Sequence, residues 1–473
     1  MTIDQLLSKR IGILGWGVNH QAMVHWLVRH GATQVTILDE AEGQADETIA
    51  GVRWQFGASA FDSLTDYDIL IRSPGILPDH PKLQAVRAAG VTISSQTQLF
   101  FDRCPARIIG VTGTKGKGTT ASIIFQMLEA EGKRQKAKGK SFNQVYLAGN
   151  IGRDPFEFLD QLTADDWVVL ELSSFQLEDL TSSPHIAVVL AIGEDHLDHH
   201  RSLTEYHTAK RSIVAYQRPT DYAILSADDP VSRSFAALTP ATKRWFSRRK
   251  DVIDGVDIAD DQDMPAFQLI QAGQQTPIVA TAELQLRGWH NQVNMAAALA
   301  AAHQAGVSLA TMATVARSFQ PLPNRLETVA IIHGVSFVND SYATAPQPTI
   351  AALDAFDRPI VLILGGRGKG ANYQSLAKAL AAANLRALVC YGEEGERFQT
   401  LQTSEQNRQI VYERMFDDAV RRAADFAQAG DVVLLSPSAT SYDQFRNYTQ
   451  RGDRFRQLVA EIARIKNQES RIK

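Results

Sequence analysis

Short apolar runs alternate with amphipathic helical stretches along the whole chain. Continuous apolar runs are typical of strands in a parallel sheet, because such strands are buried on both faces. Helical stretches between them are typical of the crossovers that parallel strands need. The pattern therefore predicts an α/β fold of parallel βαβ units, with strands at 11–17, 35–39, 68–76, 108–111, 167–171, 186–192, 337–340, 359–366, 386–392 and 431–437.

Two breaks in this pattern divide the chain into three predicted domains. The first lies near Cys104, just before a new strand, and the second lies near Phe319, just before two prolines. We expect a Rossmann-like N-terminal domain, a central domain with a parallel sheet, and a C-terminal domain with another open Rossmann-like α/β sheet. These domains, which suit a length of 473 residues, are predicted at 1–103, 104–320 and 321–473.

Composition and charge narrow the class of protein. Hydrophobic residues make up 44% of the chain and charged residues 21%, which are ordinary values for a globular protein. A net charge of −4 argues against general binding to nucleic acid or to a membrane surface. Cys104 and Cys390 have no partner motif, and no run has the length of a membrane span or the form of a signal peptide. We therefore expect a cytoplasmic enzyme without a nucleic-acid or membrane partner.

The stretch from Arg107 to Thr120, R-I-I-G-V-T-G-T-K-G-K-G-T-T, narrows the function furthest. An apolar strand runs into a glycine-rich loop, and an amphipathic helix follows. Glycines let backbone N–H groups approach a polyphosphate, and the helix directs its positive end to the same place. A lysine adds charge, and a hydroxyl can hold Mg²⁺. This order favours a nucleotide triphosphate site over a simple tight turn, and the site comprises Gly113, Thr114, Gly116, Lys117, Gly118, Thr119 and Thr120.

The first strand also ends in a glycine turn, I-G-I-L-G-W-G, and the second strand ends on Asp39. This arrangement is typical of a dinucleotide-binding fingerprint, in which the acidic residue meets a ribose or a base. His20 stands where a third glycine is expected, so the motif predicts some nucleotide-bearing ligand rather than NAD. A βαβ unit whose glycines only permit tight turns is an alternative. The candidate ligand residues are Gly15, Gly17, Asp39, Ser73 and Gly75.

Two further strand ends in the predicted central domain carry polar side chains. Glu171 ends an apolar run, where a carboxylate can bind Mg²⁺ or cap a nearby backbone. The next strand runs into G-E-D-H-L-D-H-H, which is typical of a metal site; His196 is the favoured ligand, whereas His199 and His200 are expected in a loop or at a helix start. Magnesium is favoured over zinc because cysteine and H-E-x-x-H spacing are missing. Lys210 follows and by itself is an ordinary surface lysine.

Polar residues also follow the strands of the predicted C-terminal domain. Carboxyl ends of parallel strands meet at one edge of a sheet, where ligands of open α/β folds bind. We therefore expect a second cluster of ligand-binding side chains at that edge. The candidates are Asp340, Ser341, Thr344, Lys369 and Ser441.

Together these motifs resemble the Mur ligase family. The following segments occur in the order typical of the family and extend over nearly the whole chain: T-G-T-K-G-K-G-T, G-N-I-G, E-L-S-S-F-Q, E-D-H-L-D with Lys210 after it, N-R-L-E, N-D-S-Y-A-T, L-G-G-R-G-K and S-P-S-A-T-S-Y-D-Q-F-R-N-Y-T-Q-R-G-D-R-F. The D-Q-F-R-N-Y-T-Q-R-G part is most similar to the member that joins D-glutamate to UDP-N-acetylmuramoyl-L-alanine. The resemblance implies an ATP-dependent ligase of peptidoglycan precursor synthesis that acts through an acyl phosphate, as a monomer.

The resemblance also implies roles for individual residues. The lysine of the glycine-rich loop would contact the ATP phosphates, Lys210 would be carbamylated, and the Mg²⁺ ligands would be Thr119, Glu171, His196 and Lys210. A UDP-sugar site would comprise Gly15, Gly17, Asp39, Ser73, Gly75 and Asn150. The C-terminal domain would contact ATP through Arg325 and Asp340. It would hold glutamate through Thr344, Lys369, Ser441 and Tyr448.

Three residues depart from the family's pattern. Gly118 follows the loop lysine where a hydroxyl is usual, in a spelling similar to folylpolyglutamate synthase, which shifts the expected metal ligand to Thr119. Tyr342 replaces a lysine, and Asn324 replaces a histidine before Arg325. These changes leave the stereochemistry of the amino acid open, while the D-Q-F-R-N-Y segment favours D-glutamate over L-glutamate.

Other interpretations stay open on the sequence alone. A folylpolyglutamate synthase-like ligase would share the glycine-rich loop. A catalytically silent nucleotide-binding regulator would leave Lys117, Glu171, His196 and Lys210 without a role. A dehydrogenase would use G-W-G and Asp39 but would leave the loop unexplained.

Overall fold

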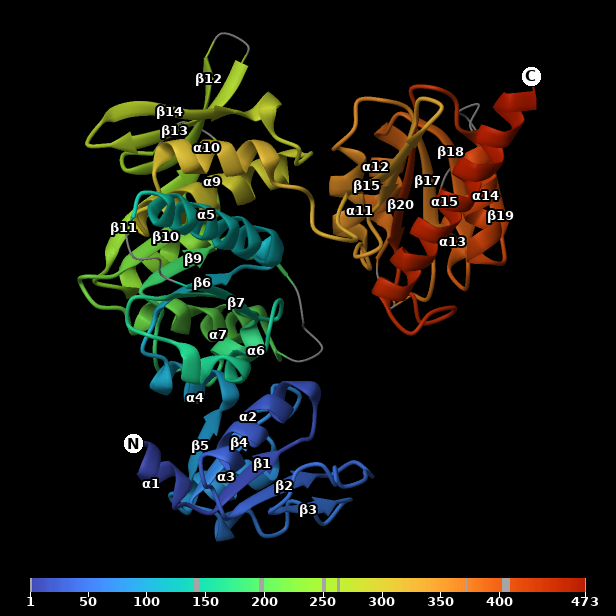
Figure 1. The fold of residues 1–473 in the computed structure, drawn as a ribbon. Helices are drawn as coiled ribbons and strands as arrows, with labels where there is room; N and C mark the ends of the chain where they lie inside the picture. Colours follow the sequence, from blue (N-terminus) through green and yellow to red (C-terminus); the bar gives the residue numbers. More distant parts are fainter. Residues whose placement is uncertain are drawn as a thin grey trace. The chain divides into compact units, whose positions relative to one another are not determined.

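The computed structural model describes residues 2–139, 144–194, 200–248, 252–261, 264–368, 370, 372–401 and 409–472. In these residues the strands form three sheets with helices around them (Figure 1). The predicted α/β fold with parallel-rich sheets is confirmed. The chain divides into two compact units, one of Met1–Glu283 with Val293–Arg317 and one of Leu284–Gln292 with Ser318–Lys473.

The N-terminal sheet has five strands in the described residues, in the order β3-β2-β1-β4-β5, and every pair is parallel. Because neighbouring side chains of a strand point to opposite faces, Leu14 and Leu38 pack on one side while Ile13 and Ile37 pack on the other. The strands are β1 (Ile11–Leu14), β2 (Val35–Asp39), β3 (Val52–Phe56), β4 (Ile69–Arg72) and β5 (Thr92–Ser95), and the helices are α1 (Ile3–Leu7), α2 (Val18–Arg29), α3 (Pro81–Ala88) and α4 (Gln96–Arg103).

The second sheet contains nine described strands in the order β14-β13-β12-β11-β10-β9-β6-β8-β7. Strands β6 to β12 pair in parallel, whereas β12, β13 and β14 form an antiparallel meander that the parallel pattern did not predict. The strands are β6 (Arg107–Thr112), β7 (Val145–Gly149), β8 (Trp167–Glu171), β9 (Ile186–Val189), β10 (Tyr222–Ser226), β11 (Thr242–Ser247), β12 (Gly255–Asp261), β13 (Met264–Gln271) and β14 (Gln274–Ala280).

Helices lie on both sides of this second sheet. Figure 1 shows α5 on one side and α6 and α7 on the other. The apolar stripe of α5 is buried, as its spacing predicts, and it includes Ile123, Ile124, Met127 and Leu128. The helices are α5 (Lys117–Ala137), α6 (Ser174–Leu177), α7 (Leu203–Ala215), α8 (Pro230–Ser234), α9 (Trp289–Gln304) and α10 (Leu309–Ser318). Short 3-10 helices occupy Leu64–Asp66, Pro155–Glu157, Leu159–Gln161, Phe235–Leu238 and Thr281–Glu283.

The C-terminal sheet has six described strands in the order β15-β16-β20-β17-β18-β19. Along β17, Leu362 and Leu364 pack with α11, α12 and α13, while Val361 and Ile363 pack with α14 and α15. The strands are β15 (Glu327–Ile332), β16 (Val335–Asn339), β17 (Ile360–Gly365), β18 (Leu385–Tyr391), β19 (Gln409–Glu413) and β20 (Val432–Ser438), and the helices are α11 (Pro346–Leu353), α12 (Gln374–Ala382), α13 (Gly395–Gln399), α14 (Phe416–Phe426) and α15 (Tyr448–Ile472).

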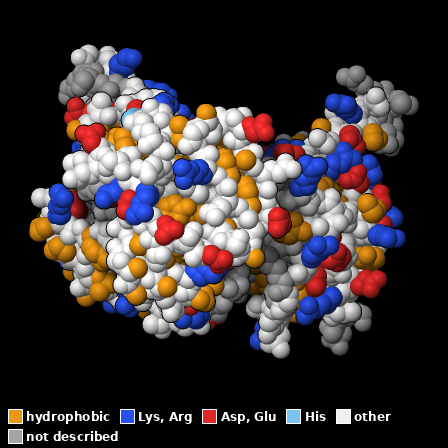
Figure 2. Space-filling model, turned by 90° about the horizontal axis from the view of Figure 1, so that it is seen from below, with side chains coloured by type: hydrophobic (Ala, Val, Ile, Leu, Met, Phe, Trp, Pro, Cys, Tyr) orange, Lys and Arg blue, Asp and Glu red, His pale blue; other side chains and the backbone are white. Residues whose placement is uncertain are grey.

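The surface carries charges of both signs. On the face drawn in Figure 2, basic and acidic side chains are interspersed with apolar ones. The whole chain has 48 lysine and arginine residues against 52 aspartate and glutamate residues. No helix within the described ranges has the length and apolar character that crossing a bilayer requires.

Candidate functional site

The glycine-rich loop joins β6 to α5 and requires glycine at two positions. Gly113 has a φ of 151°, and a Cβ there would lie 2.6 Å from Cβ of Leu190. Gly116, the N-cap of α5, has a φ of 86°, and a Cβ there would lie 2.1 Å from Oδ1 of Asn294. Both the backbone conformation and the space exclude a side chain, so the loop keeps the close backbone geometry that a polyphosphate site needs.

Lys117 is the first residue of α5, and its ammonium lies inside the loop. Its Nζ donates to the carbonyl oxygen of Gly113 at 3.1 Å and to that of Thr114 at 3.0 Å. The Thr114 hydroxyl accepts from the Gly193 N–H at 2.9 Å and lies 3.1 Å from the Tyr206 hydroxyl. The loop is therefore anchored from two sides, with a cation and the positive end of α5 at its centre.

Oxygen donors lie around the start of α5 and at the end of β8. Thr119 and Thr120 are buried in the first turn of the helix, and the buried Thr120 hydroxyl has no hydrogen-bond partner among the described residues. Glu171 is buried at the end of β8, where Val111 of β6 is its register partner. Hydroxyl and carboxylate oxygens are the donors that Mg²⁺ prefers, so these residues fit the predicted metal.

Lys210 is brought to the base of the same loop. It lies on α7 and its side chain is buried, which overturns the expectation of a surface lysine. Its Nζ donates to the Thr112 hydroxyl at 3.3 Å and to the Gly113 carbonyl at 3.0 Å, and it lies 4.8 Å from the centroid of the Tyr206 ring. The structure therefore places the Lys210 amine beside the predicted triphosphate site. The residues around Lys210 in the sequence did not distinguish it from exposed lysines.

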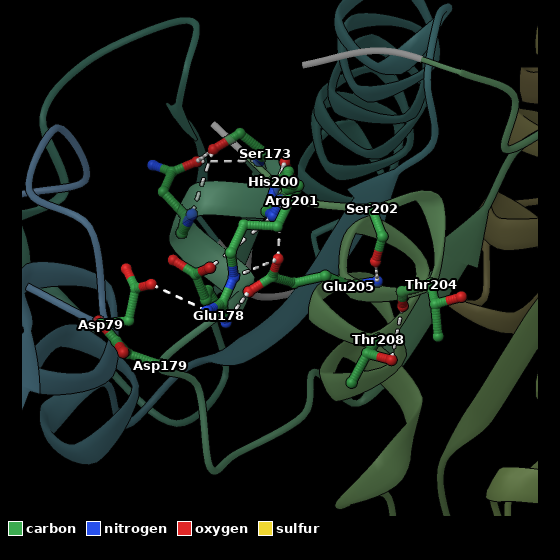
Figure 3. A network of polar contacts seen from close by, with 12 residues as sticks. Asp79, Ser173, Glu178, Asp179, His200, Arg201, Ser202, Thr204, Glu205 and Thr208 are labelled. Carbon is green, nitrogen blue, oxygen red and sulfur yellow. Dashed lines mark hydrogen bonds and ion pairs between the residues drawn. The ribbon is translucent and has the colours of Figure 1, made fainter. Parts of the chain in front are cut away.

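The histidine-rich segment before α7 is described only in part. His196 and His199 lie outside the described residues. His200, labelled in the network of polar contacts of Figure 3, is buried. Its Nε2 lies 3.0 Å from the Ser174 hydroxyl, and its ring stacks on Phe175. Among the described residues no group of three histidine, cysteine, aspartate or glutamate side chains could hold a metal ion.

Asn150 lies beside Glu171. The Asn150 N–H donates to the Glu171 carbonyl at 3.1 Å, because Gly149 and Glu171 are register partners at the ends of β7 and β8. A cavity next to this point is lined by Gln96, Thr97, Phe100, Gly149, Asp154, Pro155, Leu170, Leu172 and Gln176. Burial raises the pKa of Asp154, which accepts from the Gln96 amide at 2.8 Å.

The N-terminal ligand candidates gather at the ends of β1, β2 and β4. Gly15 has a φ of 82°, and a Cβ there would lie 3.0 Å from Cβ of Ser73. Both carboxylate oxygens of Asp39 accept backbone N–H groups, from Trp16 at 2.7 Å and from Ala41 at 2.9 Å. Asp39 therefore holds the glycine turn in place, which is a structural role that the fingerprint did not predict.

The other two glycines of this group have different surroundings. A Cβ at Gly17 would meet nothing within 4 Å, whereas the Gly75 N–H donates to the Ser73 hydroxyl at 3.4 Å. His20, at the position expected for a third glycine, is buried with Nδ1 2.8 Å from the Gly15 carbonyl. The imidazole therefore packs under the turn, and its burial lowers the His20 pKa.

Arg72 is a residue that the sequence analysis missed. It ends β4, just before Ser73, and its side chain is fully buried. Its guanidinium donates to Asp179 at 2.8 Å and to Glu178 at 3.1 Å, two carboxylates that follow α6. Both carboxylates are labelled in Figure 3. The pairing links the predicted UDP-sugar loop to the segment after Glu171. A charged residue inside the apolar run I-L-I-R was its signal, since arginine is rarely buried without a partner.

In the second unit, Asp340 contacts the backbone of Leu326, the residue that follows Arg325. Asp340 follows β16; its carboxylate accepts the Leu326 N–H at 3.2 Å and the Ser436 hydroxyl at 2.8 Å. Burial raises its pKa to about 7. The guanidinium of Arg325 lies 3.7 Å from the centroid of the Tyr342 ring.

The predicted amino-acid residues lie on neighbouring loops of this unit. The Thr344 N–H donates to the Tyr342 carbonyl at 2.8 Å. Ser441 is buried, and its carbonyl accepts from the Phe445 N–H at 2.8 Å. Tyr448 starts α15 and is 37% exposed. Lys369 lies outside the described residues.

Comparison with protein families finds three matches that follow one another along the chain. The MurD-like N-terminal domain of Mur ligases matches residues 9–95, the Mur ligase middle domain matches 111–302, and the glutamate ligase domain of Mur ligases matches 324–439. Together they extend over most of the sequence.

Curated proteins named UDP-N-acetylmuramoylalanine–D-glutamate ligase are similar over almost the full length. The protein of Symbiobacterium thermophilum is 35% identical over 97% of this chain and 99% of its own length. The protein of Acetivibrio thermocellus is 34% identical over 97% of both chains.

Solved structures share the fold at lower identity. The UDP-N-acetylmuramate-alanine ligase MurC of Thermotoga maritima has a TM-score of 0.60 and 19% identity, over 96% of this chain and 99% of its own. The MurF ligase of the same organism has a TM-score of 0.60 and 16% identity, over 98% of this chain and the whole of its own. These similarities show that the chain shares the three-domain α/β architecture of those structures.

Proposed function

Because this chain belongs to the Mur ligase family, we propose that it is an ATP-dependent ligase that joins D-glutamate to UDP-N-acetylmuramoyl-L-alanine. The observation that carries the proposal is the near full-length similarity, at 31–35% identity, to relatives named for that reaction. The product is a precursor of peptidoglycan. We further propose that the enzyme acts as a cytoplasmic monomer, with domains at 1–103, 104–320 and 321–473.

The reaction has to overcome the low reactivity of a carboxylate. An oxygen of the alanine carboxylate attacks the γ-phosphorus of ATP, and ADP leaves, which gives an acyl phosphate. The neutral amine of D-glutamate then attacks the carbonyl carbon, and the tetrahedral intermediate expels phosphate and yields the amide. The first step joins two anions, so it requires positive charge around the transferring phosphoryl group.

Residues of the first unit supply this charge in the proposal. Lys117 and the start of α5 neutralise the phosphates, and the glycine-rich loop donates backbone N–H groups. Thr119, Glu171, His196 and Lys210 would hold Mg²⁺, which shields the phosphate charge when bound. The anchoring of Thr114 by Gly193 supports a loop that is preorganised for this task.

We propose that Lys210 acts as a carbamate. A neutral lysine amine adds to CO₂, the proton leaves, and the cation becomes a carboxylate that can bind a metal. The buried position of Nζ, 3.0 Å from the Gly113 carbonyl, supports a role at the phosphate site. A carbamate at this position would add one more oxygen donor to the hydroxyls and the carboxylate already present.

The remaining substrates are assigned by position. The UDP-sugar would meet Gly15, Gly17, Asp39, Ser73, Gly75 and Asn150. Arg325 and Asp340 would contact ATP, and glutamate would meet Thr344, Lys369, Ser441 and Tyr448. The gathering of Gly15, Asp39 and Ser73 at one edge of a parallel sheet supports the first assignment, because open α/β folds bind ligands at that edge.

The test is phosphate release by the purified protein with Mg²⁺ and an amino-acid panel. We expect release only when UDP-N-acetylmuramoyl-L-alanine, ATP and D-glutamate are all present. A preference for L-glutamate at equal concentration would reassign the amino acid, an outcome that Tyr342 and Asn324 make worth testing. Release with a folate and no response to the muramoyl substrate would refute the proposal.

A further inference from the structure

Arg325, Tyr342 and Tyr448 of the second unit form a column of side chains in contact. The Arg325 guanidinium carbon lies 3.7 Å from the centroid of the Tyr342 ring. The Tyr342 ring meets the Tyr448 ring edge-on, with centroids 5.0 Å apart and planes at 90°. Resting on the proposed function, we propose that Tyr342 is a positioning residue that orients Arg325 for the nucleotide phosphates and couples it to Tyr448 at the amino acid.

The backbone on the Arg325 side of the column is held in an unusual conformation. Asn324 has a φ of 63°, in the left-handed region that asparagine adopts more readily than most residues, and Leu326 has a φ of 48°, which is costly for a leucine. The Asn324 side chain accepts from the Asn339 amide at 2.9 Å, and the Leu326 N–H donates to Asp340. Surrounding contacts therefore hold Arg325 in a sharp kink, which directs its side chain towards the column.

Hydrogen bonds also hold the backbone near Tyr342 and Tyr448. The Tyr342 N–H donates to the Asn324 carbonyl at 3.1 Å, and the Ser341 hydroxyl donates to the Tyr448 carbonyl at 2.8 Å. The fully buried Arg451 donates to the Ser341 hydroxyl at 3.0 Å and to its carbonyl at 2.9 Å. Hydrogen bonds therefore connect the backbone of Tyr342 to that of Asn324, and the backbone of Tyr448 to Ser341.

The Arg325 charge acts on the Asp340 carboxyl, where it opposes the rise in pKa that burial causes. Among the described residues no carboxylate lies within ion-pair distance of its guanidinium, and the ring face of Tyr342 is its close partner. An aromatic face orients a guanidinium without cancelling its charge, unlike a carboxylate. The column therefore presents an oriented cation to an anion such as a phosphate. Tyr342 and Tyr448 are 36% and 37% exposed, so both rings can also meet a ligand.

The test compares Tyr342→Phe, which keeps the ring face, with Tyr342→Leu, which removes it. We expect Tyr342→Leu to raise the KM for ATP about 2- to 30-fold, the range of a cation–π contact, and to raise the KM for D-glutamate as well. Tyr342→Phe should restore both values. Tyr216→Leu, which removes another exposed tyrosine, serves as the matched control and should behave as the parent protein.

Each outcome decides between the proposals. Unchanged KM values in an active Tyr342→Leu variant would overturn the inference and leave the proposed function intact. Equal losses in Tyr342→Phe and Tyr342→Leu would assign the effect to the hydroxyl and also overturn it. A fall in kcat alone, with KM unchanged, would indicate a structural role and overturn it too. An inactive parent protein would refute the proposed function itself, and the inference with it.

Discussion

Lys210 donates from Nζ to the carbonyl of Gly113 at 3.0 Å, across 97 residues of sequence. The contact joins the middle of α7 to the first residue of the glycine-rich loop. Lys117 donates to the same carbonyl from the other side of the loop, at 3.1 Å. Two lysines with unlike sequence contexts therefore converge on one backbone oxygen, and predictions about the phosphate site follow from this geometry.

Replacing Lys210 with alanine should abolish turnover while ATP still binds. The variant removes the group proposed to hold a metal, a loss for which a fall in kcat of about 100-fold or more is expected. The loop keeps Lys117 and the start of α5 for the triphosphate. Phosphate release measures kcat, and calorimetry measures ATP binding.

A matched control for Lys210 is Lys133→Ala, which removes an exposed lysine near the far end of α5 and should leave kcat unchanged. If the lysine acts as a carbamate, a short carboxylic acid should partly restore the activity of Lys210→Ala. Full activity of that variant without any addition would remove the carbamate from the mechanism.

Gly116→Ala should weaken ATP binding by at least about tenfold. The φ of 86° costs an L-residue about 1–2 kcal/mol, and the new Cβ would collide with Asn294. Gly139→Ala is the control, because Gly139 has a φ of 74° but nothing within 4 Å of the added carbon. Both variants carry backbone strain, but only Gly116 belongs to the glycine-rich loop. Therefore only Gly116→Ala should change the dissociation constant for ATP. Equal binding by the two variants would contradict the role of the loop.

Asp340 should make folding stability depend on pH. Burial raises its pKa from 3.8 to about 7, so the folded protein holds a proton that the unfolded chain has lost. Its contribution is fully present below about pH 4, and the free energy of unfolding falls as the pH rises towards 7. Each pKa unit corresponds to about 1.4 kcal/mol. Above pH 7 this contribution is constant.

The measurement for Asp340 is denaturant unfolding at a series of pH values between 4 and 8. Asp340→Asn keeps an oxygen for the Leu326 N–H and removes the titrating group. The parent protein should therefore lose unfolding free energy relative to Asp340→Asn as the pH rises from 4 to 8. A difference that stays constant with pH would show that Asp340 is ionised throughout.

Arg72→Met should destabilise the first unit by about 3 kcal/mol, because it leaves the carboxylates of Glu178 and Asp179 without their buried partner. Adding Glu178→Gln and Asp179→Asn to this variant should recover part of the loss. Thermal unfolding monitored by circular dichroism gives the change in midpoint. The control is Arg10→Met, which breaks an exposed pair with Asp68 and should cause a much smaller shift. Similar shifts for the two arginines would contradict a special role for the buried pair.

The local pattern predicted half of the strands that the structure describes. Continuous apolar runs predicted β1, β2, β4, β6, β8, β9, β16, β17, β18 and β20 at or near their observed positions. The pattern did not predict β3, β5, β7, β10, β11, β15 or β19. It also failed for the antiparallel meander of β12 to β14, because paired strands of a hairpin are specified by their partner and their turn as much as by their own apolar content.

The candidate site was predictable where its signal is local. Glycines with φ of 151° and 86° are needed for the turn itself, so the loop motif identifies Gly113 and Gly116 without the rest of the chain. Lys210 gave no such signal, and the only local signal of Arg72 was its charge within an apolar run. The first is buried only because α7 packs against the loop, and the second only because Glu178 and Asp179 approach it from another element.

The order of apolar and polar residues therefore determined the α/β elements, the glycine-rich turn and the family motifs, because each depends on residues that are close in the chain. Tertiary packing decided which distant groups meet, such as Arg325 with Tyr342 and Lys210 with Gly113. It also decided which charges are buried, and with them the raised pKa of Asp340. The physical reason is that desolvation and pairing depend on the whole surroundings of a group in space, which a linear pattern does not contain.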